Sequence, residues 1–377
     1  MSGAPLALYV HWPFCVSKCP YCDFNSHVRP QVDQPGWREA LLTDLAHEAR
    51  LLPERKLTSI FFGGGTPSLM ELATVEAVIT AAWQHWPAAD DLEITLEANP
   101  NSVEAARFAD LAAAGVNRLS LGLQSFDDEA LRFLGRAHSA REGWGALEIA
   151  QKNFRRVSFD LIYALPGDTE ERWAATLAQA LSLGTSHLSL YQLTIEPGTR
   201  FASMVARRQF EPLEPDAAAA LYELTEAMTS SAGMPGYEIS NYARSKQESR
   251  HNLTYWRYGD YSGVGPGAHG RRLGMRTVRH KKPENFLSGL RRNGHGIAEE
   301  EPLTPREAAD EALVMGLRLS EGIDIDAAER RFGVDLADRR KIESLVESGH
   351  LSRSGRRISP TSAGRLVLDR ILAEIAA

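Results

Sequence analysis

Cys15, Cys19 and Cys22 lie close together, and the sequence contains no other cysteine. With the spacing C-x3-C-x2-C, one short loop can bring each thiolate to a different iron of an iron–sulfur cluster. A cubane normally has four cysteine ligands, so its fourth iron would be open to an exogenous ligand. The alternatives are three unrelated buried thiols, or a zinc site completed by His11 or His27. Zinc loops usually add a distant second pair of cysteines, and none exists here, so the spacing favours a [4Fe-4S] cluster.

The composition is that of an ordinary globular protein, with 43% hydrophobic and 24% charged residues. A length of 377 residues suggests two or three domains. The net charge of -7 argues against a nucleic-acid partner or an acidic-lipid surface. Cysteines gathered in one loop suit a reducing compartment. The apolar opening at residues 6–10 is too short for a secretory signal, and no run is long enough to span a membrane. We therefore predict a cytoplasmic protein that is not an integral membrane protein.

Six apolar segments that alternate with helical patterns predict the strands of residues 1–200. They are Leu6–His11, Leu57–Phe62, Leu92–Glu97, Asn117–Gly122, Val157–Ile162 and Ser186–Gln192. The helices between them are predicted at Trp37–Leu52, from a Ser68–Glu71 capping box to Trp86, from Asn99-Pro100 to Gly115, after a Ser139–Glu142 cap, and at Thr169–Leu183. Repeated strand–helix units predict parallel strands joined by right-handed crossovers. Six units are too few to close an eight-unit barrel, so the prediction is an α/β fold with an open partial (βα)6 barrel. Its chemistry is expected at the C-terminal ends of the strands.

The pattern changes after residue 200. Residues 201–300 look irregular, with several glycine-rich and aromatic loops that predict an extension or lid across the barrel mouth. From Thr304 the chain is helical, and the segment Leu345–Leu351 followed by a turn at Gly355 predicts a small winged-helix-like domain. Basic and acidic residues are balanced there, so DNA binding is not expected. The predicted division is residues 1–200, 201–300 and 301–377.

Polar groups and glycines follow the predicted strands. Gly63–Gly65 would let the backbone approach a ligand closely, and Thr66 adds a hydroxyl group. Other strand ends and loops contribute the polar side chains of Glu97, Gln124, Asp160 and Arg136. Each alone could be a solvated loop residue or a cap, but a barrel would bring them together.

These motifs resemble the radical-SAM superfamily, whose members bind S-adenosylmethionine (SAM) at the open iron of such a cluster. The resemblance extends to the oxygen-independent coproporphyrinogen III oxidase family through Tyr-x-His-x-Pro-Phe-Cys (9–15), Gly-Gly-Gly-Thr-Pro (63–67), Gly-Leu-Gln-Ser-Phe (122–126) and Asp-Leu-Ile-Tyr-x-Leu-Pro (160–166). The resemblance implies that Tyr9, Tyr21, Gly64 and Glu97 contact SAM. It also implies that Gly65, Thr66, Gln124, Arg136 and Asp160 line a second SAM site or an adjacent ligand site.

Two departures from the oxidases point to a subgroup. The oxidases have a further cysteine where this chain has Phe24, and a longer segment before the position of Tyr9. Residues 251–256, His-Asn-Leu-Thr-Tyr-Trp, match the H-N-x-x-Y-W motif of the HemW subgroup. That resemblance implies a heme chaperone, with His251 as a heme contact and Tyr255 and Trp256 as flat apolar surface. Chemistry alone favours a packed, hydrogen-bonded histidine of the extension over a heme contact, and the motif reverses this preference. His269 is a second candidate.

Two functions follow from the resemblance. The first is a carrier that binds heme beside a SAM-ligated cluster and passes heme to acceptor apoproteins, including acceptors of the respiratory chain at a membrane. The second is a radical-SAM enzyme that modifies a porphyrin side chain, as coproporphyrinogen III oxidase does. Phe24, the short N-terminal segment and residues 251–256 favour the carrier.

Overall fold

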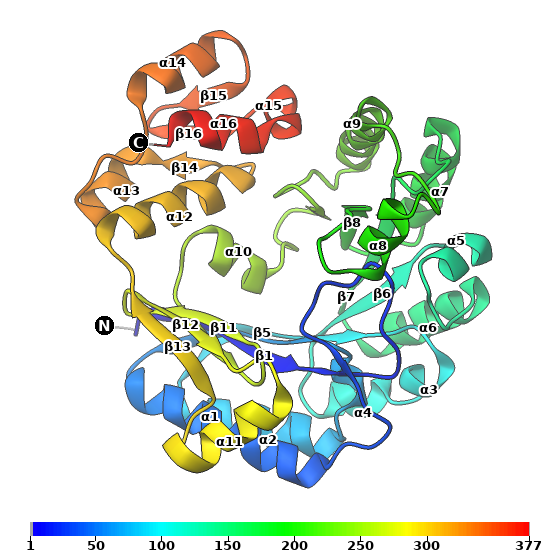
Figure 1. Ribbon diagram of the computed structural model, residues 1–377, viewed down its shortest axis with the longest axis vertical. Coiled ribbons are helices and arrows are strands. Elements are labelled where there is room, and N and C mark those ends of the chain that lie inside the picture. Colours follow the sequence, from blue (N-terminus) through cyan, green and yellow to red (C-terminus); the bar gives the residue numbers. More distant parts are fainter. Residues whose placement is uncertain (1–2, 377) are drawn as a thin grey trace.

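Six parallel strands form the centre of the fold in the computed structural model, which describes residues 3–376. They are β1 (Pro5–Trp12), β4 (Lys56–Gly64), β5 (Ala88–Ala98), β6 (Arg118–Gln124), β7 (Arg156–Tyr163) and β8 (His187–Gln192). They pair in chain order, each parallel to its neighbours. Every predicted strand overlaps one of them, so the predicted α/β fold with an open partial barrel is confirmed (Figure 1).

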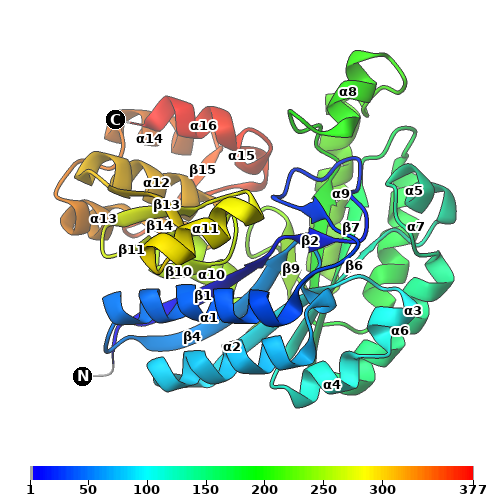
Figure 2. The same cartoon turned by 60° about the horizontal axis from the view of Figure 1, so that its bottom comes forward.

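Helices cover the convex face of this curved sheet. The longest are α1 (Gln34–Leu51), α2 (Leu72–His85), α6 (Ala140–Asn153) and α7 (Glu170–Ser182), and the short ones are α3 (Ser102–Ala105), α4 (Phe108–Ala113) and α5 (Asp128–Phe133). Figure 2 shows α1 and α2 side by side, running along β1 and β4. The predicted cap at Ser139 and Glu142 is confirmed as a capping box, and Gly115 has the predicted helix-ending geometry with φ 106°.

The predicted capping box at Ser68 and Glu71 is wrong. Ser68 lies in a short 3-10 turn that begins at Pro67, and its buried hydroxyl group donates to the carboxylate of Glu104 instead. The helix predicted after Asn99-Pro100 is also divided into α3 and α4. At the break, the Arg107 side chain donates to the carbonyl groups of Ser68 and Met70. Both differences come from contacts between segments that are distant in the sequence.

The prediction that residues 201–300 are largely irregular is also wrong. They form α8 (Arg200–Ala206), α9 (Pro215–Ser231), β9 (Asn241–Ala243), α10 (Arg250–Trp256), β10 (Tyr261–Val264), β11 (His269–Arg272), β12 (Met275–Arg279), α11 (Pro283–Asn293) and β13 (Ile297–Pro302). β10 pairs in parallel with β1, and β9 pairs antiparallel with β8, so the described part of the sheet has 11 strands. Leu221, Val264 and Phe286 belong to the barrel core. The extension is therefore packed as part of the barrel.

A second hydrophobic core lies in the C-terminal part of the chain, between Ala309 and Ile375. It is built by α12 (Pro305–Arg318), β14 (Ile323–Asp324), α13 (Ile325–Phe332), α14 (Arg339–Glu347), β15 (Leu351–Ser354), β16 (Arg357–Pro360), α15 (Ser362–Leu366) and α16 (Leu368–Ile375). The strands form an antiparallel sheet in the order β14-β16-β15, with the predicted turn at Gly355 between β15 and β16. We call this part the C-terminal unit. The three-part division of the chain stays a prediction.

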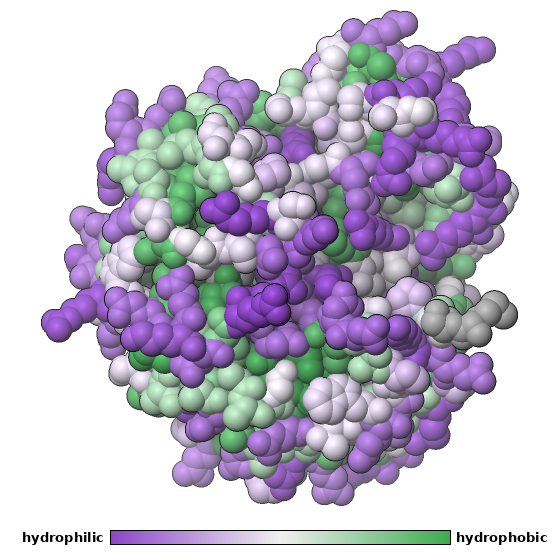
Figure 3. All heavy atoms as spheres, turned by 180° about the vertical axis from the view of Figure 1, so that it is seen from behind, coloured by the Kyte–Doolittle hydropathy of each residue, from purple (hydrophilic) through white to green (hydrophobic). Residues whose placement is uncertain are grey.

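The surface carries a mixture of hydrophilic and hydrophobic side chains, as Figure 3 shows for one face. Exposed large apolar residues include Val16 and Phe24, at 73% and 60% exposure. No helix within residues 3–376 is both long enough and apolar enough to cross a membrane.

Candidate functional site

A cavity of about 750 Å³ opens at the C-terminal ends of the parallel strands. This volume is typical of a small-molecule site. Most of the predicted site residues line it: Cys15, Cys19, Tyr21, Cys22, Gly64, Gly65, Thr66, Glu97, Gln124, Arg136 and Asp160. The parallel strands bring these residues together because they end at the same edge of the sheet. Tyr9, His251 and the second heme candidate, His269, lie outside the cavity lining.

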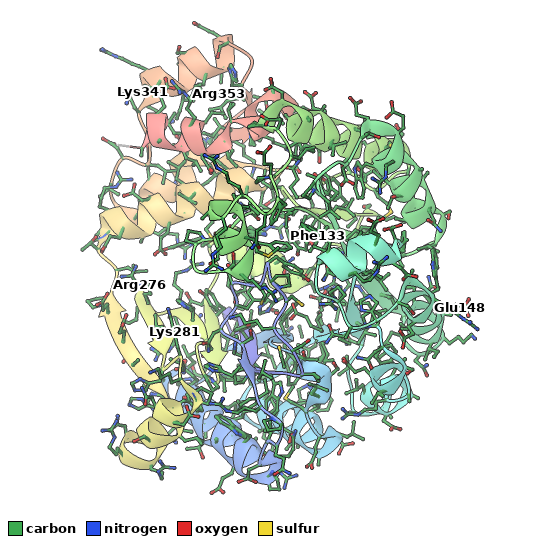
Figure 4. The ribbon with its side chains drawn as sticks, turned by 45° about the vertical axis from the view of Figure 1, so that its right-hand side comes forward. Phe133, Glu148, Arg276, Lys281, Lys341 and Arg353 are labelled. Carbon is green, nitrogen blue, oxygen red and sulfur yellow. The ribbon has the colours of Figure 1, made fainter. Side chains whose placement is uncertain are left out.

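The cysteines lie in the segment that follows β1, which we call the cysteine loop (residues 13–28). Its two ends pair as β2 (Phe14–Cys15) and β3 (His27–Val28). The amide group of Asn25 donates to the carbonyl oxygens of Pro266 and Lys281, at 2.9 Å each (Lys281 is labelled in Figure 4). The extension therefore fixes the position of the cysteine loop.

The three thiols are partly buried and have polar neighbours. The Cys15 sulfur atom lies 3.5 Å from the Thr66 hydroxyl group, and the Cys19 sulfur atom lies 3.5 Å from the Arg136 guanidinium group. The Cys22 sulfur atom lies 3.9 Å from the Ser26 hydroxyl group. Burial raises the pKa of Cys15 and of Cys22. Both are therefore thiols in the free protein, and a bound metal would displace their protons. Three cysteines on one wall of a cavity, each beside a hydrogen-bonding group, fit the ligand set of an iron–sulfur cluster.

The histidines considered for a zinc site have hydrogen-bond partners other than the cysteines. The His11 ring is hydrogen-bonded at Nδ1 to the Tyr9 hydroxyl group and at Nε2 to the carbonyl oxygen of Asn25, both at 2.9 Å. Nε2 of His27 lies 3.3 Å from Oδ1 of Asn25 and 3.3 Å from the carbonyl oxygen of Lys281. These contacts favour the cluster over the zinc alternative.

A hydrogen-bonded chain connects two of the cysteines. Arg136 Nη2 donates to Asn99 Oδ1 at 2.6 Å, and Asn99 Nδ2 donates to Thr66 Oγ1 at 3.3 Å. Since Thr66 and Arg136 are the neighbours of Cys15 and Cys19, the chain fixes the relative positions of these two residues. Asn99 lines the cavity and was not predicted as a site residue. Its position directly after a strand and before Pro100 is the sequence signal that could have identified Asn99 as a site residue.

The glycine turn after β4 lies directly against the cysteine loop. Gly64 has φ 110°, and a Cβ atom there would lie 2.5 Å from the His11 ring. A Cβ atom on Gly65 would lie 2.7 Å from the carbonyl oxygen of Phe14. The Gly65 N–H donates to the carbonyl oxygen of Trp12 at 2.6 Å. Glycine is therefore required for this close approach, which leaves backbone rather than side chains facing the cavity.

Two carboxyl groups lie in the cavity with raised pKa values. Burial, together with the nearby Asp160 carboxyl group, raises the pKa of Glu97 to about 8. Burial raises the pKa of Asp160 to about 6, although Ser189 and Arg118 oppose the shift. Both carboxyl groups resist ionisation in the free protein. A ligand that brings positive charge or hydrogen-bond donors would stabilise their ionised forms.

Gln124 ends β6 in a left-handed conformation with φ 67°, which is rare for a residue other than glycine. Its Oε1 atom is buried and has no hydrogen-bond partner among the described residues. A strained residue with an unused acceptor in a cavity is typical of a ligand-binding position.

The Tyr21 ring packs near Phe201, with ring centroids 6.4 Å apart.

Tyr9 and His251 lie together in the interior of the barrel, with ring centroids 6.1 Å apart. The His251 ring stacks on Phe61 at 4.9 Å, and its Nδ1 is hydrogen-bonded to the Ser59 hydroxyl group at 3.1 Å. His251 is 3% exposed, and burial lowers its pKa to about 3, so the ring is neutral. The structure thus buries this predicted heme contact. His269 is exposed at the start of β11, also outside the cavity lining.

A second wall of the cavity was missed by the sequence analysis. It is formed by Tyr191 near the C-terminal end of β8, Tyr222 on α9, Ile239 and Ser240 before β9, and Arg318 on α12. Tyr191 has 41% of its surface exposed. No motif marked these residues, because they come from four elements that only the fold brings together.

Comparisons with known proteins agree with this architecture. Residues 9–180 match the family model of the radical SAM superfamily, and residues 303–367 match that of the HemN C-terminal domain. The solved structure of coproporphyrinogen III oxidase (HemN) from Escherichia coli, a radical SAM enzyme, covers 99% of this chain. The match covers 90% of the HemN chain, with a TM-score of 0.83 and 24% identity. The chain therefore has the radical-SAM fold of HemN.

Relatives of higher identity indicate the family. The chain is 40% identical to radical S-adenosyl methionine domain-containing protein 1, mitochondrial, of Bos taurus, over 97% of this chain and 86% of that protein. It is 42% identical to the heme chaperone HemW of Escherichia coli, over 76% of each protein. It is also 35% identical to HemW of Haemophilus influenzae, over 98% of this chain and 97% of that protein. The chain belongs to the HemW family of radical SAM proteins.

Proposed function

We propose that this protein is a heme chaperone, which carries a [4Fe-4S] cluster and SAM, binds heme, and transfers it to acceptor proteins. The observation that carries the radical-SAM part is that the three cysteines line the same cavity as Glu97 and Asp160. The names of the HemW relatives support the heme part.

Cys15, Cys19 and Cys22 would hold the cluster through their thiolates. When bound, the cluster supplies electrons and an open iron to SAM. The residues of the chain would orient SAM beside that iron. Glu97 and Asp160 would receive its cationic and hydroxyl groups, and the unused acceptor of Gln124 would take a further donor. The remaining proposed SAM contacts are Gly64, Gly65, Thr66, Arg136 and Tyr21 in the cavity lining, and Tyr9 outside that lining.

One experiment separates the proposed carrier from a porphyrin-modifying enzyme. Anaerobically reconstituted protein is incubated with SAM, dithionite, and either coproporphyrinogen III or heme, and the products and bound heme are then measured. We expect stable heme uptake and no decarboxylation of coproporphyrinogen. Formation of protoporphyrinogen would instead assign the chain to the oxidases and contradict the carrier.

SAM affinity is expected to rise with pH between about 6 and 8. Because the pKa of Glu97 is about 8 in the free protein, its carboxyl group must lose a proton to receive a cation. Each pH unit below that value should weaken binding by up to about tenfold. Equilibrium dialysis with SAM at several pH values measures this slope, and Glu97→Gln should flatten it. Glu148→Gln, which changes an exposed carboxylate labelled in Figure 4, should keep the wild-type slope.

The raised pKa of Glu97 makes the stability of the free protein fall with rising pH, whereas SAM affinity is expected to rise. The folded pKa of Glu97 lies above the ordinary value of 4.5, so the folded state binds more protons than the unfolded state between these values. The free energy of unfolding therefore falls as the pH rises from about 4.5 to 8. Glu97→Gln should weaken this fall. An unchanged pH dependence in both binding and stability would remove Glu97 from the proposed site.

His251→Ala is expected to weaken heme binding and to leave the cluster content unchanged. Because the ring is buried against Phe61, direct contact with heme requires α10 to move away from the barrel interior. Loss of the ring should also lower the free energy of unfolding by roughly 2–4 kcal/mol. Thermal unfolding is therefore measured alongside heme affinity, to separate a loss of stability from a loss of binding. The matched variant His85→Ala, at an exposed position at the end of α2, should bind heme normally. Undiminished heme binding by His251→Ala would place the heme contact elsewhere.

A further inference from the structure

The second wall of the cavity differs in chemistry from the wall that carries the cysteines. Tyr191, Tyr222 and Ile239 present aromatic and apolar surface, and Arg318 adds a guanidinium group from the C-terminal unit. The Tyr222 hydroxyl group and Arg318 Nε are buried and have no hydrogen-bond partner within residues 3–376. This wall therefore combines flat apolar surface with unused hydrogen-bond donors.

Arg318 is held in position by two contacts. Its Nη2 atom donates to Glu238 Oε2 at 3.2 Å, and its guanidinium group lies 4.6 Å from the centre of the Trp256 ring. Glu238 is 1% exposed, and its other oxygen accepts from the Ser240 N–H at 2.9 Å and from Asn241 Nδ2 at 2.6 Å. An arginine fixed on an aromatic ring loses little conformational freedom when it binds a ligand.

The one-third exposure of the Arg318 side chain leaves it accessible at the cavity wall. Of its three nitrogen atoms, only Nη2 donates to a described residue, Glu238. A guanidinium group binds carboxylates well because its N–H groups match the two carboxylate oxygens. The tyrosine and isoleucine side chains favour a planar apolar body beside that carboxylate.

We propose that Arg318 receives a carboxylate of a planar tetrapyrrole, which lies against Tyr191, Tyr222 and Ile239. This inference rests on the proposed heme function and locates heme by its propionate groups. It requires no movement of α10. It also gives a residue of the H-N-x-x-Y-W motif a role, because Trp256 positions the guanidinium group.

The test compares heme with its dimethyl ester, in which both propionates are neutral. Wild-type protein should bind heme roughly tenfold to a hundredfold more tightly than the ester, as expected for a charge-assisted contact. Arg318→Gln should lose this preference, mainly through weaker binding of heme, and Arg318→Lys should retain much of it. SAM affinity and cluster content should stay near the wild-type values in both variants.

Arg257→Gln is the matched control. Arg257 is exposed outside the cavity and pairs with Glu321 of the C-terminal unit at 2.8 Å. The Arg257→Gln variant should therefore keep the wild-type preference for heme over its dimethyl ester. The inference is overturned if Arg318→Gln retains the full preference, or if Arg257→Gln loses it equally, and in either case the proposed heme function stands. Failure of wild-type protein to bind either ligand overturns the proposed function and this inference together.

Discussion

Cys19→Ala is expected to abolish the iron–sulfur cluster of the reconstituted protein. Two thiolates would remain on a loop arranged for three, and Arg136 would lose the sulfur atom that lies 3.5 Å from its guanidinium group. Iron content should fall from about four atoms per chain to a small fraction of that value. The broad visible absorbance of the cluster should disappear with the iron. Metal analysis and absorbance after anaerobic reconstitution measure both effects.

Ser17→Ala is the control for this experiment, because Ser17 is exposed on the same loop. It should retain the iron and absorbance of the wild-type protein. An intact four-iron cluster in Cys19→Ala would exclude Cys19 as a ligand. Equal losses in both variants would mean that the loop tolerates no change, and Cys19→Ser would then decide whether the sulfur atom is needed.

The barrel could be predicted because its signals are local. Parallel strands are buried on both faces, so β1 and β4 are largely apolar segments in the sequence. Once the strands are known, their ends must meet at one edge of the sheet. This geometry placed Glu97 and Asp160 in the same cavity without any knowledge of the structure.

The extension could not be predicted in the same way. β11 and β12 carry Arg272 and Arg279, which look like surface residues in a polar loop. They are 3% and 0% exposed because their partners, Asp44 and Glu48, come from α1, more than 200 residues earlier. The burial of His251 likewise depends on the distant residue Ser59. Charge pairs of this kind leave no periodic pattern in either segment.

Arg279→Met is expected to destabilise the protein strongly. Its guanidinium group pairs with Glu48 at 2.6 Å and with Asp44 at 3.2 Å, and all three side chains are fully buried. Removing the cation leaves carboxylates without their full charge partner in the interior, which typically costs about 3–5 kcal/mol. Urea unfolding at pH 7 measures the loss. Burial alone would raise the pKa of Glu48, but Arg279 and Arg272 lower it to about 2. The stability from this ionised carboxylate is therefore present above pH 4.5 and lost as the pH falls toward 2.

The matched control for this substitution is Arg276→Met, on the same strand. Arg276 is 47% exposed and pairs with Glu301 at the surface (Figure 4). Exposed ion pairs contribute about 0–1 kcal/mol, so this variant should unfold near the wild-type denaturant concentration. Similar unfolding free energies for the two variants would contradict a stabilising role for the buried network.

The Arg279 network should also affect the cysteine loop. Asp44, which pairs with Arg279, accepts hydrogen bonds from the N–H groups of Gly265 and Gly296, at 3.1 and 3.0 Å. The turn at Gly265 includes Pro266, whose carbonyl oxygen binds Asn25 of the cysteine loop. Loosening the network should therefore loosen the loop, and Arg279→Met should lose iron to a chelator faster than Arg276→Met. If both variants lose iron at the wild-type rate, then the cysteine loop keeps its geometry independently of the extension.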